Sequence, residues 1–253
     1  MKTKLIGIFI CMLLIGTVLP ASGTVIKTNN TASSNRSGNI LYVGGSGEGN
    51  YSSIQDAIDD AVDGDTVFVY DDSSPYYEFV VVNKSINLIG ENRETTVIDG
   101  GGSGFVCISA DGVTISGFTI RNESFGINIR SNSNTITSNT ITSNSWYGID
   151  LHYSSGNTIT GNTISLNNKY GIRLFNSVGN TILKNNFIGN KRAAFFYNNV
   201  EIKWERNTWK QNYWNRPRVL PKLIFGEIEV IEESIFMPWF NIDWHPAQEP
   251  YDI

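Results

Sequence analysis

A motif that returns every 22 or 23 residues in the middle of the chain constrains the fold more than any other feature of the sequence. Segment 126–129 reads Gly-Ile-Asn-Ile, segment 148–151 reads Gly-Ile-Asp-Leu, and segment 171–174 reads Gly-Ile-Arg-Leu. Asn-Thr-Ile triplets recur in step with this motif and begin at Asn134, Asn157 and Asn180. A fixed period of this length is the signature of a solenoid, in which each unit buries its apolar face against its neighbours.

Each unit contains three short segments rich in Ile and Thr, separated by Asn, Ser or Gly. No segment is long enough, or rich enough in helix formers, to be a helix. Leucine-rich repeats share the period, but they need a Leu-dominated pattern and usually a helical segment. We therefore predict a coil of three strands per turn, whose turns stack into three parallel sheets around a narrow apolar core. Two inner columns are expected, formed by Ile127, Ile149 and Ile172 and by Ile136, Ile159 and Ile182.

The Asn residues that separate the segments are expected to lie at the corners of the coil. Asn tolerates the left-handed backbone conformation that tight corners need. Its carboxamide can also hydrogen-bond to the equivalent Asn about 4.8 Å above or below, which is the spacing of stacked strands. The repeated Asn residues are therefore predicted to be structural.

Composition and charge narrow the class of protein. Of the 253 residues, 40% are hydrophobic and 17% are charged, a mixture too apolar for a disordered chain. The formal net charge is −5 and the isoelectric point is about 5.1. Nucleic-acid binding needs a basic stripe, so we expect no nucleic-acid partner.

The beginning of the chain reads as a secretory signal over residues 1–23. A positively charged start precedes an apolar run from Leu5 to Leu19, and the small residues at 21–23 offer a cleavage site. An uncleaved N-terminal anchor is the alternative. Both interpretations predict a secreted or cell-surface protein, with residues 24–39 as a flexible leader and no later membrane span.

The first elements of the fold are predicted to be a strand, a helix and a strand. Residues 40–43 form a short strand, apolar residues recur at helical spacing over residues 54–62, and residues 66–70 alternate into a second strand. Ser52 with Gln55 is a candidate capping box for the helix. The apolar face of this helix is expected to cover the end of the stack that follows.

Several segments resemble right-handed parallel β-helix proteins. They are Ser53–Ile58, Gly64–Val67, Lys84–Gly90 and the Asn-Thr-Ile repeats. Among those proteins the chain is most similar to the NosD-like group with carbohydrate-binding and sugar-hydrolysis (CASH) repeats, which is common among secreted archaeal proteins. The resemblance covers roughly residues 40–215 and implies an all-β, pectin lyase-like fold. It implies little about function, because lyases, hydrolases, adhesins and accessory proteins share this scaffold.

We predict a β-helix domain of about six coils at residues 40–203, capped by the helix at its start and by an irregular aromatic tail at residues 204–253. A cap is expected because the open end of a stack exposes a strand edge that invites aggregation. Residues 223–235 read as one or two strands, and residues 237–246 read as irregular. The tail contains Trp204, Trp209, Trp214, Trp239 and Trp244. Its alternative role is an aromatic platform for sugar rings.

Alternation along the strands places two columns of side chains on the outer face of one sheet. One column contains Cys107, Asn128, Asp150 and Arg173, and the other contains Ser109, Arg130, His152 and Phe175. Neighbours in a column lie about 5 Å apart, so Asp150 is expected to pair with Arg173 and to contact Arg130 diagonally. The candidate binding residues are Asn128, Arg130, Asp150, His152 and Arg173.

Three roles remain open for this outer face: it binds an acidic or neutral sugar chain, it cleaves one, or it is a solvated face held by charge pairs. Glycoside hydrolysis needs two carboxylates, and only Asp150 lies in these columns. The calcium cage that the resemblance implies for a polysaccharide lyase is missing. We predict a non-catalytic protein that binds a polysaccharide or cell-surface glycan, or that forms part of an envelope layer.

The resemblance also raises copper binding, as in a NosD-like periplasmic accessory protein. Copper sites need His, Met or Cys close together. After signal removal the chain offers only His152, His245, Met237 and Cys107, in separate regions. The acidic pairs at 59–60 and 71–72 are candidates for calcium, although exposed charge at a helix end and a turn is the favoured explanation. We expect no bound cofactor, with calcium left open and copper disfavoured.

Overall fold

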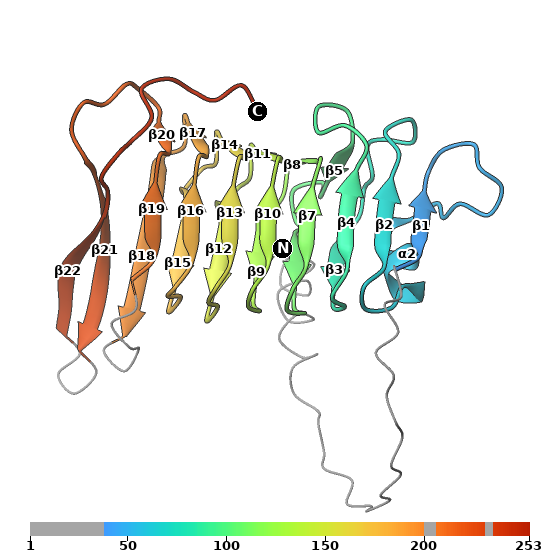
Figure 1. Cartoon of the computed structure of the whole chain (residues 1–253), viewed down its shortest axis with the longest axis horizontal. Coiled ribbons are helices and arrows are strands. Elements are labelled where there is room, and N and C mark those ends of the chain that lie inside the picture. The colour runs from blue at the N-terminus through green and yellow to red at the C-terminus, as the bar shows by residue number, and fades with distance from the viewer. Residues whose placement is uncertain (1–37, 200–205, 231–234) are drawn as a thin grey trace, which may run out of the picture.

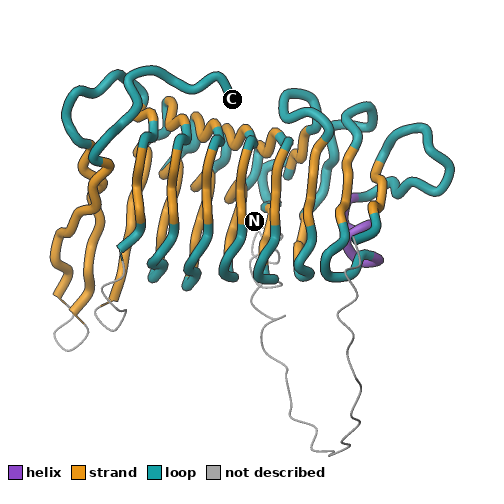
Figure 2. Tube along the Cα trace, in the orientation of Figure 1, coloured by secondary structure: helices purple, strands orange, loops and turns teal. Residues whose placement is uncertain are grey.

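The computed structural model describes residues 38–199, 206–230 and 235–253. In this part of the chain, short parallel strands wind into a solenoid of about seven turns, which lie side by side from β1 to β22 (Figure 1). Strands alternate with tight corners along each turn (Figure 2). The predicted right-handed β-helix is confirmed, with about one turn more than predicted. The predicted signal and most of the predicted leader lie outside the described residues.

The turns stack into three parallel sheets, as predicted. The first stack contains, in order, β1 (Ile40–Val43), β2 (Thr66–Val69), β4 (Asn87–Gly90), β7 (Thr114–Ser116), β10 (Thr135–Thr137), β13 (Thr158–Thr160), β16 (Thr181–Leu183) and β19 (Thr208–Lys210). The second contains β3 (Val80–Val82), β6 (Val106–Ile108), β9 (Phe125–Ile129), β12 (Tyr147–His152), β15 (Tyr170–Phe175) and β18 (Arg192–Asn199). The third contains β5 (Val97–Asp99), β8 (Thr119–Arg121), β11 (Thr140–Thr142), β14 (Thr163–Ser165), β17 (Asn186–Ile188) and β20 (Tyr213–Trp214).

Isoleucine side chains of successive turns fill the inside of the coil. Ile127, Ile149 and Ile172 are partners across β9, β12 and β15, and all three are completely buried. The column of Ile136, Ile159 and Ile182 is formed in the same way. Burying one such side chain stabilises a fold by roughly 1.5–3 kcal/mol. Repeated apolar positions therefore supply most of the stability of the solenoid.

Buried Asn side chains form three ladders that run along the coil. The ladders are Asn134–Asn157–Asn180–Asn207, Asn139–Asn162–Asn185–Asn212 and Asn144–Asn167–Asn190. At each step the backbone N–H and the Nδ2 group of one Asn donate to Oδ1 of the next, as at Asn162 and Asn185 with 3.0 Å for both bonds. The predicted structural role is confirmed. Every ladder has a direction, because its donors point toward the C-terminal end of the solenoid.

The left-handed corner residues are not the ladder Asn residues that we expected. They are the residues directly before them, such as Ser133, Ser138 and Ser143, with φ of 59°, 55° and 57°. The ladder geometry explains the difference. An Asn whose backbone N–H and side chain must both reach the next turn leaves the sharp change of direction to the residue before it.

The N-terminal end of the solenoid is covered by α2 (Ile54–Asp60), which packs against β1, β2 and β3. Its apolar face buries Ile54, Ala57 and Ile58, as the spacing predicts. The N-cap is Ser53, whose side chain accepts from the backbone N–H of Asp56, so the predicted capping box at Ser52 is wrong by one residue.

The C-terminal end is covered by an antiparallel hairpin of β21 (Lys222–Val230) and β22 (Ile235–Asp243). β21 pairs with β18, and β22 pairs with β19, so the hairpin joins the second stack to the first. The prediction of an irregular segment over residues 237–246 is wrong up to Asp243, because those residues find a strand partner in β21. The coil also continues past the predicted end of the repeat, since β19 and β20 extend it to Trp214.

Tertiary packing separates the Trp residues of the tail into two groups. Trp209 and Trp214 are buried in the last turn, whereas Trp239 and Trp244 are exposed. Trp204 lies outside the described residues. In the part of the chain that the structure describes, no helix is long and apolar enough to cross a bilayer.

Candidate functional site

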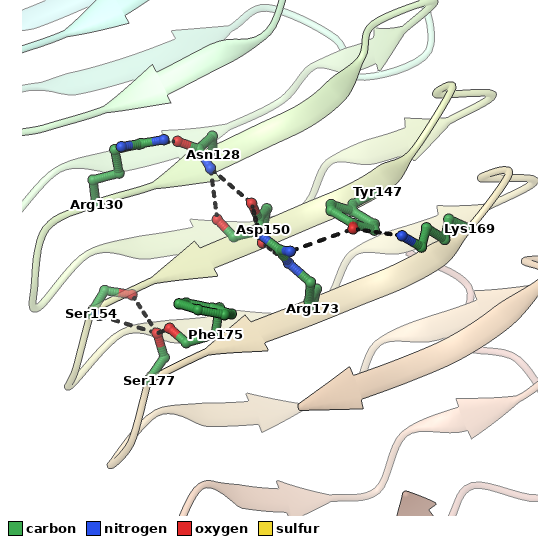
Figure 3. Close-up of polar contacts among 9 residues, drawn as sticks. All are labelled: Asn128, Arg130, Tyr147, Asp150, Ser154, Lys169, Arg173, Phe175 and Ser177. Carbon is green, nitrogen blue, oxygen red and sulfur yellow. Dashed lines mark hydrogen bonds and ion pairs between the residues drawn. The ribbon is translucent and has the colours of Figure 1, made fainter. Parts of the chain in front are cut away.

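The predicted outer columns are formed by β6, β9, β12 and β15. Cys107 is the partner of Asn128, Asn128 of Asp150, and Asp150 of Arg173. His152 is the partner of Phe175 in the second column. Figure 3 shows the polar side chains of this face meeting between the strands. The register predicted from the repeat is therefore correct at the candidate site.

Asp150 and Arg173 form the predicted ion pair in a bidentate geometry. Nε of Arg173 lies 2.6 Å from Oδ1 of Asp150, and Nη2 lies 2.8 Å from Oδ2. Nδ2 of Asn128 donates to the same Oδ2 at 3.1 Å. Asp150 is only 2% exposed and Asn128 only 3%, so the interpretation of this row as a solvated face is wrong at these two positions.

The charges of the pair depend on one another. Burial raises the pKa of Asp150, and the hydrogen bonds and charge of Arg173 oppose that effect. Burial acts to lower the pKa of Arg173, but the hydrogen bond and charge of Asp150 outweigh it and raise that pKa. With both oxygens bonded and almost no exposure, the Asp150 carboxylate is suited to holding Arg173 in place.

Arg130 and His152 reach this row differently from the prediction. Nε of Arg130 donates to Oδ1 of Asn128 at 2.7 Å, so its contact with Asp150 passes through the Asn side chain. The imidazole of His152 stacks on Phe175, with ring centroids 4.8 Å apart. Burial, followed by the charges of Arg130 and Arg173, lowers the pKa of His152 to about 4. His152 is therefore a neutral ring at physiological pH.

An aromatic row borders the polar row at the start of the strands, and the sequence analysis missed it. The ring of Tyr147 stacks on that of Tyr170 at 5.4 Å, and Phe125 packs against Tyr147 on the other side. The guanidinium of Arg173 lies 4.5 Å from the ring centre of Tyr147. Nζ of Lys169 lies 5.0 Å from the ring centre of Trp146, which is 51% exposed.

A sequence signal for this row exists, because an aromatic residue precedes the first Gly of all three repeats. The Gly itself is required by the close stacking of the turns. A Cβ on Gly148 would lie 2.6 Å from the carbonyl oxygen of Gly171 and 2.8 Å from Nδ2 of Asn167. The inward position must therefore stay empty, and the preceding aromatic ring takes the outward position.

A second aromatic row follows at the end of the strands. Phe175 stacks between His152 and Tyr197, at 4.8 Å from each, and Tyr153 packs edge-on against Phe175. The hydroxyl of Tyr197 donates to the carboxylate of Glu229, which raises the pKa of the tyrosine to about 12. The outer face thus presents a rigid polar row between two rows of rings.

Glycoside hydrolysis by two carboxylates would need acidic groups closer together than Asp150 and Glu229 lie. Glu229 lies on β21, three strands from Asp150 on β12. At about 4.8 Å per strand the separation across the sheet alone is about 14 Å, beyond the roughly 5–9.5 Å between the carboxyl groups of glycosidases. Within the described residues, no cluster of three or more His, Cys, Asp or Glu side chains could hold a metal ion.

The sequence matches the family described as "Right handed beta helix region" over residues 62–215. The chain belongs to this family. Comparison with curated proteins and with solved structures gives no match. The family match does not divide the β-helix proteins further, so the NosD-like, CASH and archaeal assignments stay predictions. β-helix proteins with different activities share one scaffold, so function has to be argued from the outer face.

Proposed function

We propose that this β-helix protein binds a carbohydrate chain, without cleaving it, on the outer face of β9, β12 and β15. The observation that carries the proposal is the polar row of Asn128, Asp150 and Arg173 between two rows of stacked rings. Aromatic rings offer apolar faces to sugar rings. The partly exposed side chains of Arg130 and Arg173, which Asn128 and Asp150 hold in place, offer donors to hydroxyl groups. Repetition along the stack suits a repeating polymer.

The rigidity of this face supports binding. Asp150 holds Arg173 by two bonds, and Asn128 ties Arg130 to the same network. Side chains fixed before a ligand arrives lose little rotamer freedom when it binds. The exposed rings of Trp146 and Tyr153, at 51% and 59%, are the natural first contacts.

The same geometry favours binding over hydrolysis or lyase action. The carboxylate of Asp150 is buried and already bonded to two side chains. A general acid or base must exchange a proton with the substrate, which needs a free and accessible oxygen. We place the protein in the secreted or cell-surface compartment on the strength of residues 1–23, and an envelope component is the related alternative.

A polysaccharide binding array, run with and without calcium, tests the proposal. Trp146→Ala and Tyr153→Ala are expected to weaken binding at least about tenfold, and each folded variant is checked by circular dichroism. Tyr42→Ala on β1 is the matched control, because Tyr42 is an exposed ring of the first stack. Binding that is equal in all three variants would refute the outer face as the site.

Two further measurements separate the alternatives. Loss of binding in Trp244→Ala alone would assign the sugar platform to the tail, where Trp244 is 63% exposed. Release of new reducing or unsaturated ends from any bound polysaccharide would show cleavage and overturn the non-catalytic assignment.

A further inference from the structure

The third Asn ladder ends in a different way from the second. In the second ladder, the backbone N–H and Nδ2 of Asn212 donate to Oδ2 of Asp243 at 2.9 and 3.2 Å. A carboxylate thus accepts the last pair of donors. The third ladder ends at Asn190, whose Nδ2 donates to the carbonyl of Ile164 at 2.7 Å. Among the described residues, nothing accepts its backbone N–H or its second Nδ2 hydrogen.

The missing acceptor can be located from the repeat. Asn185 donates to Asn212, 27 residues further along the chain. The step is one residue shorter at this corner, because the residue before Asn190, Gly189 with φ of 64°, has its counterpart in Asn215 with φ of 63°, 26 residues further on. The residue after Asn215 is Arg216, whose side chain carries donors and no acceptor. The donors of Asn190 therefore point into the space that a ladder Asn would fill.

That space is a cavity of about 190 Å³ with basic walls. Asn190 and the ring of Trp214 line it, and none of its lining residues, all in the described part of the chain, is acidic. The cationic side chains that line it are Lys191, Arg192, Arg216, Arg218 and Lys222.

Within the described residues, none of the basic side chains of the cavity forms an ion pair. Nε of Arg218 is buried and has no hydrogen-bond partner among the described residues. Burial and the charge of Arg216 lower the pKa of Arg218, and burial with the charges of Arg218 and Arg216 lowers that of Lys222. Asp243 is the cross-strand partner of Lys222, but its carboxylate is bonded to the second ladder.

We propose that this cavity binds an oxyanion, namely a carboxylate, sulfate or phosphate group, whose oxygen takes the place of the missing ladder acceptor. The carboxylate of Asp243 performs this role one ladder away. The negative charge of the anion also reduces the repulsion among the side chains of Arg216, Arg218 and Lys222. The site lies one strand beyond the carbohydrate face, since Arg192 on β18 is the partner of Tyr170 on β15, and neither proposal depends on the other.

The size of the cavity indicates a small anionic group. It is below the roughly 300–1,000 Å³ of pockets that enclose a drug-sized ligand. A second cavity of about 380 Å³, lined by Phe195 and Phe225, shares Arg192 and Lys222 with it. The anion is therefore either a free ion or the charged group of an acidic sugar whose ring extends into the second cavity.

Titration of the ¹⁵N-labelled protein with sodium phosphate, sodium sulfate, sodium glucuronate and glucose, at constant ionic strength, tests the site. The amide signal of Asn190 is expected to shift and saturate with the anions and to stay in place with glucose. Glucuronate binding tenfold tighter than phosphate and sulfate would assign an acidic sugar, and the reverse order a free ion. An unmoved Asn190 signal, or an equal shift with chloride, would overturn the proposal.

Two variants make the test specific. Arg218→Gln combined with Lys222→Gln is expected to weaken anion binding roughly tenfold or more, because charge-assisted hydrogen bonds are lost. Arg93→Gln, which removes a cation at the other end of the solenoid, is the control. Arg216→Asp supplies an internal carboxylate at the ladder position and is expected to abolish anion binding and raise the melting temperature. Unchanged anion affinity in both the double variant and Arg216→Asp would contradict the site.

Discussion

A buried carboxyl group lies at the C-terminal end of the second ladder and another at the N-terminal start of the third. The first has hydrogen-bond donors for both oxygens, and the second has none among the described residues. Asp243 ends the second ladder, where Oδ2 accepts from Asn212 and from Nε1 of Trp214, the latter at 3.0 Å. Its Oδ1 accepts from the backbone N–H groups of Gln211 and His245 at 3.1 and 3.2 Å. The side chain is completely buried, and both oxygens are bonded.

Glu123 occupies the first position of the third ladder, before Asn144. Its backbone N–H donates to Oδ1 of Asn144 at 3.1 Å, as a ladder residue should. Its carboxyl group is completely buried, and neither oxygen has a hydrogen-bond partner among the described residues. Gly100 leaves room for it, since a Cβ there would lie 1.8 Å from Oε2. Burial, with the charge of Asp99, raises the pKa of Glu123 to about 9.

The direction of the ladder explains the contrast. Donors point toward the C-terminal end, so a carboxylate placed there receives hydrogen bonds. At the N-terminal end the first side chain has to find donors in the preceding turn. Oδ1 of Asn139 finds the backbone N–H of Phe118 at 3.1 Å, but the longer side chain of Glu123 reaches past that position.

The largest effect is expected from removing the satisfied carboxylate. Asp243→Ala leaves the donors of Gln211, Asn212, Trp214 and His245 without their acceptor, and we expect a loss of roughly 4 kcal/mol in the free energy of unfolding. Asp243→Asn keeps one acceptor oxygen but turns an NH2 group toward N–H donors, and it should lose about 2 kcal/mol. Urea denaturation measures both variants, and equal losses would show that acceptance from the ladder contributes nothing.

An acid in the middle of a ladder tests the direction itself. In Asn162→Asp a carboxylate oxygen replaces the NH2 group that donates to Asn185 and to the carbonyl of Ile136. We expect the free energy of unfolding to fall by about 3 kcal/mol at pH 8. Because acceptors facing a carboxylate raise its pKa, the loss should shrink as the pH falls toward 4. A pH-independent loss in urea titrations would contradict the direction of the ladder.

Neutralising the orphaned carboxyl should stabilise the protein. Glu123→Gln is expected to add about 2 kcal/mol at pH 8 and almost nothing at pH 4. The folded protein holds a proton that the unfolded chain releases, so wild-type stability falls as the pH rises from about 4.5 toward about 9. Thermal unfolding across this range, with the exposed Glu94→Gln as control, measures the difference. The same pH dependence of stability in Glu123→Gln and wild type would show that Glu123 does not cause it.

The smallest effect concerns His152, whose pH dependence has the opposite sign. Its folded pKa of about 4 lies below the ordinary value of 6.5. Its contribution is complete above pH 6.5 and is lost as the pH falls toward 4. Because the ring is only half-buried, we expect about 1 kcal/mol or less. His152→Gln should remove this slope from the stability profile and leave the slope of Glu123, and a steeper acid slope in the variant would show that another group causes it.

The sequence predicts much of the outer face because its period fixes the register. Once Asp150 and Arg173 are one period apart, parallel stacking brings their side chains together. The burial of Asp150 is not predictable in this way, since its carboxylate is bonded to Asn128 and to Arg173, and Arg173 itself packs against the rings of Tyr147 and Phe175. The aromatic row is visible in the repeat, but each ring lies one residue before the Gly-Ile motif that defines the period.

Local pattern by itself determined the period, the inner isoleucine columns and the structural role of the repeated Asn residues, because each depends on contacts that repeat in every turn. It also determined the terminal helix, because the spacing of its apolar residues is local. Tertiary structure decided what happens where the repetition stops. Residues 235–243 become a strand only because β21 offers an edge, and Asp243 is satisfied only because a ladder ends beside it. Glu123 finds no donor in the preceding turn, and Asn190 finds no acceptor in the following one, and neither mismatch is visible in a single repeat.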